Sequence, residues 1–257
     1  MIKDLDQETW EAMQKLAQEV GPVEGYNLTD LGNAERLVLL HKDKLLYCHL
    51  WRKWLVWDGK RWKVDTTAEV WRYAIETIRR IYAEAQAIDD REARLKVGNH
   101  AIRSESGARI REMISLAKCQ TGIPVEPEEF DKDPWLLNVL NGTVDLKTGE
   151  LRKYSKEDLM TKLAPVNFDP AAKCPLWLKF LDKIMQGNLN LIQYLQRVAG
   201  YCLTGRVSEQ KLFFGHGGGA NGKSTFLNVL EGILGDYAVK TDPELLIRKP
   251  PGAHTTA

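Results

Sequence analysis

The feature that most constrains the fold is a glycine-rich loop in residues 211–235, between a short apolar stretch and an amphipathic helix pattern. Glycines let the backbone wrap a polyphosphate, and the N-terminus of the following helix adds a favourable dipole. The segment therefore predicts a strand over 212–214, a phosphate-binding loop and a helix. Four residues match the phosphate-loop pattern G-x-x-x-x-G-K-[ST]: Gly217, Gly222, Lys223 and Ser224.

The loop residues have distinct expected roles. The Lys223 ammonium can reach the β- and γ-phosphates, and the Ser224 hydroxyl can hold Mg²⁺. ATP and Mg²⁺ are therefore the expected ligands, with the metal held through the nucleotide. A glycine-rich surface turn without a ligand is the weaker interpretation, because apolar residues flank the loop on both sides. The predicted nucleotide-binding residues are Gly217, Gly218, Gly219, Ala220, Asn221, Gly222, Lys223, Ser224 and Thr225.

Composition narrows the class of protein. Hydrophobic residues make up 44% and charged residues 28% of the 257, which is ordinary for a globular chain. The formal net charge is +1, so any contact with nucleic acid must come from local patches. The four cysteines form no C-x-x-C pair, which argues against a zinc site or a disulfide framework and favours a reducing cytoplasm. No run reaches the roughly 18 apolar residues of a membrane span, so no membrane contact is expected.

The pattern before the loop is mainly helical. Thr29 or Asp30 suits the N-cap of one short helix. Two further helices are expected to pack against each other just before the glycine-rich loop. Proline and glycine around 250–252 indicate that the last twenty residues are poorly ordered. Helices are predicted over 1–20, 68–88, 91–102, 105–119, 176–185 and 189–203.

Two hairpins interrupt the helices. Asp58-Gly59 suits a type I′ turn, and Asn141-Gly142 indicates a second hairpin turn. Gly149 supplies a positive-φ position before a third strand of the second unit. The pairing predicts two apolar faces: Leu55, Trp57, Trp62 and Val64 in the first hairpin, and Leu137, Val139, Val144 and Leu146 in the second.

The stretch 42–63 has two interpretations. It interleaves seven Lys or Arg residues with four tryptophans, which would suit single-stranded DNA binding by stacking and phosphate contact. Alternatively, the tryptophans are core and the lysines solvate the other face. We favour the core interpretation, because the hairpin register already buries Trp57 and Trp62.

Three stretches together resemble one family. The N-terminal TDLGNAERL with its WDGKRW hairpin, the central NVLNGTVDLKTGEL and the loop GHGGGANGKST occur in this order in the phage, plasmid and poxvirus primase–helicases. Their motor belongs to the superfamily 3 helicases, in which an asparagine at the position of Asn221 is typical of the nucleotide loop. The resemblance covers most of the chain, from about 27 to 246.

The resemblance implies a hexameric, ATP-driven helicase that translocates on single-stranded DNA in phage or plasmid replication. Residues 1–170 would form an α+β collar or loading region, mainly helical with small β-hairpins. Residues 171–257 would begin an α/β phosphate-loop (AAA+-like) ATPase domain. The family's second acidic motif, polar sensor and arginine finger find no match here, and neither does its primase domain. We therefore expect a truncated piece with no catalytic residue identified and with feeble ATP hydrolysis at most.

Two rival interpretations stay open. The chain could be a non-catalytic single-stranded-DNA-binding or assembly module, with stretch 42–63 as its contact surface. It could also be an unrelated phosphate-loop kinase or ATPase, which would need an acidic strand end that the sequence does not offer.

Overall fold

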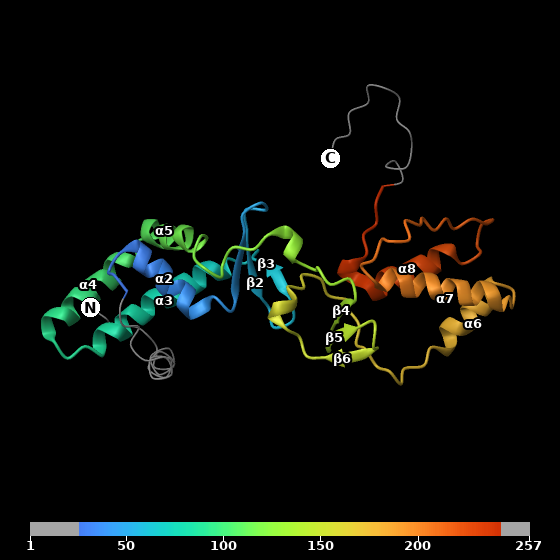
Figure 1. The fold of residues 1–257 in the computed structure, drawn as a ribbon, viewed down its shortest axis with the longest axis horizontal. Helices are drawn as coiled ribbons and strands as arrows, with labels where there is room; N and C mark the ends of the chain where they lie inside the picture. Colours follow the sequence, from blue (N-terminus) through green and yellow to red (C-terminus); the bar gives the residue numbers. More distant parts are fainter. Residues whose placement is uncertain (1–25, 243–257) are drawn as a thin grey trace, which may run out of the picture. The chain divides into compact units, whose positions relative to one another are not determined.

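The computed structural model describes residues 26–242, which fall into two compact units. Of the described residues, unit 1 comprises 26–132 with Lys156–Thr161, and unit 2 comprises Asp133–Ser155 with 162–242. Figure 1 traces their elements along the chain. The helix predicted over 1–20 and the C-terminal residues after 242 lie outside the described residues. The expected boundary near residue 170 stays a prediction.

In its described part, unit 1 joins four helices to a three-stranded antiparallel sheet of order β1-β2-β3. The predicted helices over 68–88, 91–102 and 105–119 are confirmed with ends shifted by a few residues. The short helix before the sheet begins after Thr29, as expected. The elements are α2 (Asp30–His41), β1 (Leu45–Cys48), β2 (Lys53–Trp57), β3 (Trp62–Val64), α3 (Glu69–Gln86), α4 (Arg91–Ser104), α5 (Gly107–Ala117) and the short 3₁₀ turns η1 (Pro127–Glu129) and η2 (Lys156–Asp158).

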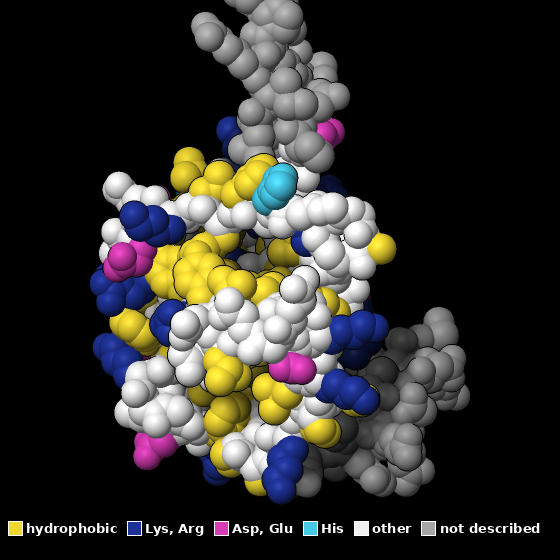
Figure 2. Space-filling model, turned by 90° about the vertical axis from the view of Figure 1, so that its right-hand side faces the viewer, with side chains coloured by type: hydrophobic (Ala, Val, Ile, Leu, Met, Phe, Trp, Pro, Cys, Tyr) yellow, Lys and Arg dark blue, Asp and Glu magenta, His cyan; other side chains and the backbone are white. Residues whose placement is uncertain are grey.

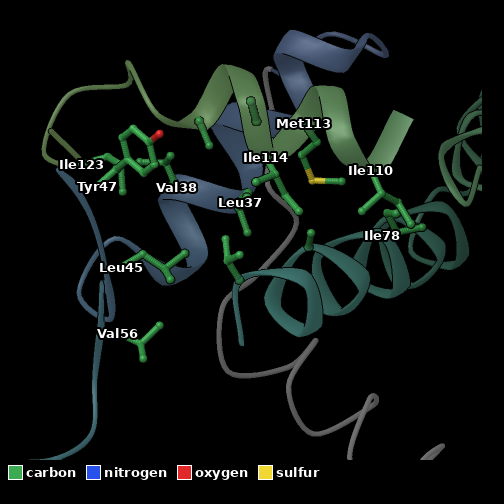
Figure 3. Packing of buried hydrophobic residues seen from close by; sticks show 14 residues of the cluster. Leu37, Val38, Leu45, Tyr47, Val56, Ile78, Ile110, Met113, Ile114 and Ile123 are labelled. Carbon is green, nitrogen blue, oxygen red and sulfur yellow. The ribbon is translucent and has the colours of Figure 1, made fainter. Parts of the chain in front are cut away.

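The sheet of unit 1 is covered on both faces. Side chains of a strand alternate between faces, so adjacent Leu55 and Val56 enter different hydrophobic clusters. Val56 joins the larger cluster with side chains from α2, α3 and α5, which Figure 3 shows converging between helices and sheet. Leu55 joins a smaller cluster with Trp62, Val125 and Phe130.

The first hairpin has the predicted face but a different turn. Leu55 pairs with Val64, and Trp57 pairs with Trp62. The turn closes through Asp58 N donating to the Arg61 carbonyl at 3.1 Å, so Gly59 and the residue after it are central. Of these two central residues only Gly59 has a positive φ, at 93°, whereas a type I′ turn needs a positive φ at both. The predicted type I′ turn at Asp58-Gly59 is therefore wrong.

The tryptophans bear out the core interpretation in large part. Trp62 is 3% exposed and its Nε1 donates to the Lys156 carbonyl at 2.9 Å. Trp54 and Trp57 are half-buried against the two clusters. Trp51 differs: it is 40% exposed and stacks on Phe130 with ring centroids 5.2 Å apart.

Up to residue 242, unit 2 contains a second three-stranded antiparallel sheet, of order β4-β5-β6, and three helices. The helices predicted over 176–185 and 189–203 are confirmed, as is the helix after the glycine-rich loop. The fold is thus α+β, with helices and small antiparallel sheets. The elements are β4 (Leu136–Val139), β5 (Gly142–Asp145), β6 (Glu150–Arg152), α6 (Pro175–Ile184), α7 (Leu189–Leu203), α8 (Lys223–Leu234) and the 3₁₀ turn η3 (Gly235–Tyr237).

The second hairpin, like the first, has the predicted apolar face but a displaced turn. The four residues of its predicted face share one cluster, in which Leu137, Val139 and Val144 are buried and Leu146 is partly buried. Val139 pairs with Gly142, so Gly142 closes the turn rather than standing inside it. The predicted hairpin is therefore confirmed, but its turn lies one residue earlier than Asn141-Gly142. The positive φ predicted for Gly149 is confirmed, at 73°.

The strand predicted over 212–214 does not form. An extended segment needs a neighbouring strand to pair with, and these residues have none among those described. Leu212 is 79% and Phe214 84% exposed. Figure 2 shows the side of the molecule with α6, α7 and α8, where hydrophobic side chains gather at the surface. Among the described residues of unit 2, the large hydrophobic side chains that are more than half exposed are Leu176, Leu178, Leu189, Val207, Leu212, Phe214, Leu227 and Val239.

Candidate phosphate-binding site

The glycine-rich loop leads directly into α8. Gly222 is the N-cap of the helix with φ 84°, a left-handed conformation that glycine adopts without strain. Its carbonyl accepts from Phe226 N at 2.9 Å, which begins the helical hydrogen-bond ladder. Lys223 is the first helical residue, and the exposed Ser224 and Thr225 follow in the first turn. All predicted site residues therefore lie in one loop and one helix start.

Gly217 and Gly222 each combine a positive φ with a closely approaching side chain. A Cβ on Gly222 would lie 2.7 Å from Ile184 Cγ2 and 3.1 Å from Phe180 Cε2, both on α6. A Cβ on Gly217 would lie 2.0 Å from Asn221 Nδ2. Gly218 and Gly219 have open space there instead. Gly217 and Gly222 thus shape the loop, whereas the backbone at Gly218 and Gly219 stays accessible.

The Lys223 ammonium lies inside the loop. It donates to the Gly217 carbonyl at 2.9 Å, the Gly218 carbonyl at 3.1 Å and Asn221 Oδ1 at 2.7 Å. A positive charge therefore sits at the helix N-terminus, where the helix dipole already favours anions. Backbone N–H groups, a helix start and one ammonium suit a phosphate chain.

Helix α8 is anchored at its other end to the sheet of unit 2. Tyr237, just after the helix, accepts from Asn138 N through its hydroxyl at 3.1 Å. The Asp236 carboxylate accepts from Leu163 N at 3.2 Å. A Cβ on Gly235 would lie 2.3 Å from Pro165 Cδ, so glycine permits this approach. The C-terminal end of α8 is therefore tied to β4 and to residues 163–165 of unit 2.

Aromatic rings support the loop from α6. Trp177 stacks on Phe180 and on Phe226 of α8, with centroids 5.3 and 5.6 Å apart. The sequence predicts that α6 packs against α7, but it does not reveal that Phe180 and Ile184 lie under Gly222. The amphipathic stripe of α6 was the available signal, and it does not specify a partner.

In unit 1, the stretch TDLGNAERL is structural. Thr29 Oγ1 accepts from Gly32 N at 3.1 Å and caps α2. A Cβ on Gly32 would lie 2.0 Å from the Asn27 carbonyl oxygen, so only glycine permits this approach. Asn33 is fully buried and its Nδ2 donates to Ser104 Oγ at 2.9 Å.

The same stretch contributes a buried charge. The Arg36 side chain is 3% exposed, and its Nε lies 3.3 Å from Glu84 Oε2 on α3. Its two terminal nitrogens donate to the carbonyls of Asn27 and Tyr26, at 3.1 and 3.2 Å. Burial raises the pKa of Glu84, against the opposing pull of Arg36. The motif therefore fixes the chain entering α2 and joins α2 to α3.

Comparison with known proteins agrees with this architecture. The sequence profile of the family described as "D5 N terminal like" matches residues 34–186, which is more than half of the chain. That range contains both small sheets and ends before the glycine-rich loop. The chain belongs to this family, and it is a protein of the phage and viral primase–helicase type.

A curated relative points the same way. The chain is 28% identical over 123 residues to "Putative helicase L207/L206" of Acanthamoeba polyphaga mimivirus. The aligned stretch is 47% of this chain but only 13% of that protein. Among residues 26–242, no helix has the length and hydrophobicity needed to cross a membrane.

Proposed function

We propose that this chain is part of a replicative DNA helicase and that its glycine-rich loop binds ATP with Mg²⁺. The observation that carries the proposal is the loop itself, closed around the Lys223 ammonium at the start of α8. The family and the viral relative support the helicase assignment. In this proposal the complete motor is a hexamer that moves along single-stranded DNA, located in the cytoplasm of the host.

The residues present fit a nucleotide's phosphates. The backbone at Gly218 and Gly219 is open to a ligand, and Lys223 supplies a cation that the β- and γ-phosphates would draw from its loop acceptors. The exposed Ser224 hydroxyl would coordinate Mg²⁺, with Thr225 beside it. Bound ATP–Mg²⁺ would supply the free energy for translocation.

Titration with a fluorescent ATP analogue tests the proposal. We expect magnesium-dependent binding that Lys223→Ala weakens at least tenfold, because an ammonium–phosphate contact is charge-assisted. Lys211→Ala is the matched control, since this exposed lysine precedes the loop. Absence of magnesium-dependent binding, or equal loss in both variants, would refute the proposal.

One observation favours a second function, single-stranded DNA binding by unit 1. One face of the Trp51 ring stacks on Phe130. The next two residues, Arg52 and Lys53, are both exposed. Aromatic platforms beside cations bind single strands by stacking and phosphate contact. Fluorescence anisotropy with single-stranded DNA at two salt concentrations tests this. Salt-sensitive binding that survives Lys223→Ala but not Trp51→Ala supports it, and binding that survives Trp51→Ala contradicts it.

A further inference from the structure

Asn221 contacts both ends of the loop. Its Oδ1 accepts from Lys223 Nζ at 2.7 Å, the shortest of the three contacts of that ammonium. Its Nδ2 lies in the space that a Cβ on Gly217 would occupy. The Asn221 side chain thus contacts both Gly217, at the start of the loop, and Lys223, at its end.

The ammonium of Lys223 has three N–H donors, and the loop supplies three acceptors. Two of these are backbone carbonyls, so they are present whatever the side chains are. Asn221 supplies the third, and it is the acceptor that substitution can remove. A lysine side chain has several flexible bonds and loses conformational entropy when its ammonium is fixed on a phosphate. Each acceptor in the loop restricts the side chain beforehand, so less entropy remains to be lost on binding.

The backbone beside Asn221 is constrained. Ala220 has φ 55°, a left-handed conformation that a residue with a Cβ adopts at a cost. Gly222, on the other side, has φ 84°. The chain therefore turns sharply before and after Asn221, and this directs the amide inward, to Lys223 and Gly217.

We infer that Asn221 is a positioning residue that holds the Lys223 ammonium inside the loop, where the phosphates of a nucleotide would bind. The inference rests on the nucleotide site proposed above. A phosphate oxygen is a stronger, charged acceptor than the neutral amide oxygen, so the ammonium transfers to the nucleotide when it binds. The amide then keeps its contact with Gly217 and preserves the shape of the loop.

The first measurement uses the nucleotide-free 257-residue protein. Acylation by a small activated ester, followed by peptide mass spectrometry, gives a rate for Lys223 relative to Lys211. We expect Asn221→Ala to raise this relative rate about threefold, because one of three acceptors is lost. Asn228→Ala, an exposed asparagine on α8, should leave it unchanged. Equal rates in the wild type and in Asn221→Ala would overturn the inference, whether or not ATP binds.

The second measurement is the titration with the fluorescent ATP analogue. Asn221→Ala should weaken binding about fivefold, and Asn228→Ala should not. Asn221→Asp has nearly the same shape, so Lys223 acylation should stay slow. Its carboxylate, however, would retain the ammonium and repel phosphate, so binding should fall further than in Asn221→Ala. Wild-type affinity in Asn221→Asp would overturn the inference. If the wild type binds no nucleotide, the proposed function fails, while the acylation rates still decide whether Asn221 holds Lys223.

Discussion

His41 makes the stability of unit 1 sensitive to acid. The residue ends α2, is 4% exposed and packs against Tyr73, with ring centroids 4.5 Å apart and ring planes tilted by 33°. Neither of its ring nitrogens has a hydrogen-bond partner among the described residues. Burial, together with the positive charges of Lys44 and Arg80 and against the opposing charge of Asp43, lowers the pKa of His41 from 6.5 to about 4.

The sign and the size of the effect follow from this pKa. Above pH 6.5 the ring is neutral in both the folded and the unfolded protein. Between 6.5 and about 4, the unfolded chain gains a proton that the folded one excludes, so stability falls as the pH falls. From pH 7 to pH 5 this difference in proton binding amounts to about 2 kcal/mol of unfolding free energy.

The assay is urea-dependent hydrogen exchange, read on peptides of α2 and α3 so that only unit 1 is measured. Wild type and His41→Leu are compared at pH 7 and pH 5. The variant should lose about 2 kcal/mol less on acidification, because leucine cannot be protonated. Other titrating groups, such as Glu84 and His100, are present in both proteins and cancel. His216→Leu, an exposed histidine of unit 2, is the control. An equal acid dependence in wild type and His41→Leu would refute the reasoning.

Three further predictions concern single sites. Arg36→Met should lower the unfolding free energy of unit 1 by about 3 kcal/mol in the same exchange assay, because Glu84 stays buried without its partner; a loss below about 1 kcal/mol would count against a buried ion pair. Gly222→Ala should lower the midpoint of thermal unfolding by several degrees, since its Cβ would meet Ile184, whereas Gly218→Ala should not; equal midpoints would contradict the contact. A protein of residues 1–257 should hydrolyse ATP feebly or not at all in a phosphate-release assay, and turnover that Lys223→Ala abolishes would speak against this.

Local patterns in the sequence determined most of the elements. Thr29 caps α2 because its side-chain oxygen accepts a hydrogen bond from the backbone N–H of Gly32, three residues later. This contact is local and does not depend on the rest of the fold. The apolar faces of both hairpins follow from two-residue alternation, which needs no knowledge of the partner. The phosphate-loop pattern likewise located Gly222 at the start of α8, because a helix N-terminus after glycine is a local event.

Contacts between distant segments decided the rest. Both hairpin turns shifted from the predicted central pair, because strand pairing across the sheet selects which residues close the turn. The strand over 212–214 was predicted from its apolar residues, but a strand exists only with a neighbour to pair with. Whether a tryptophan is core or surface depended on its place relative to the sheet: Trp62 lies in β3 and is buried, whereas Trp51 lies in the turn between β1 and β2 and is 40% exposed.

The candidate site divides in the same way. The sequence alone identified Gly217, Lys223 and Ser224 as one motif, because their chemistry requires a fixed spacing. Only the tertiary structure placed Phe180 beneath Gly222 and turned the Asn221 amide toward Lys223. Spacing along the chain specifies which groups can meet a phosphate, whereas packing against α6 and the turns of the loop backbone specify which of them meet each other.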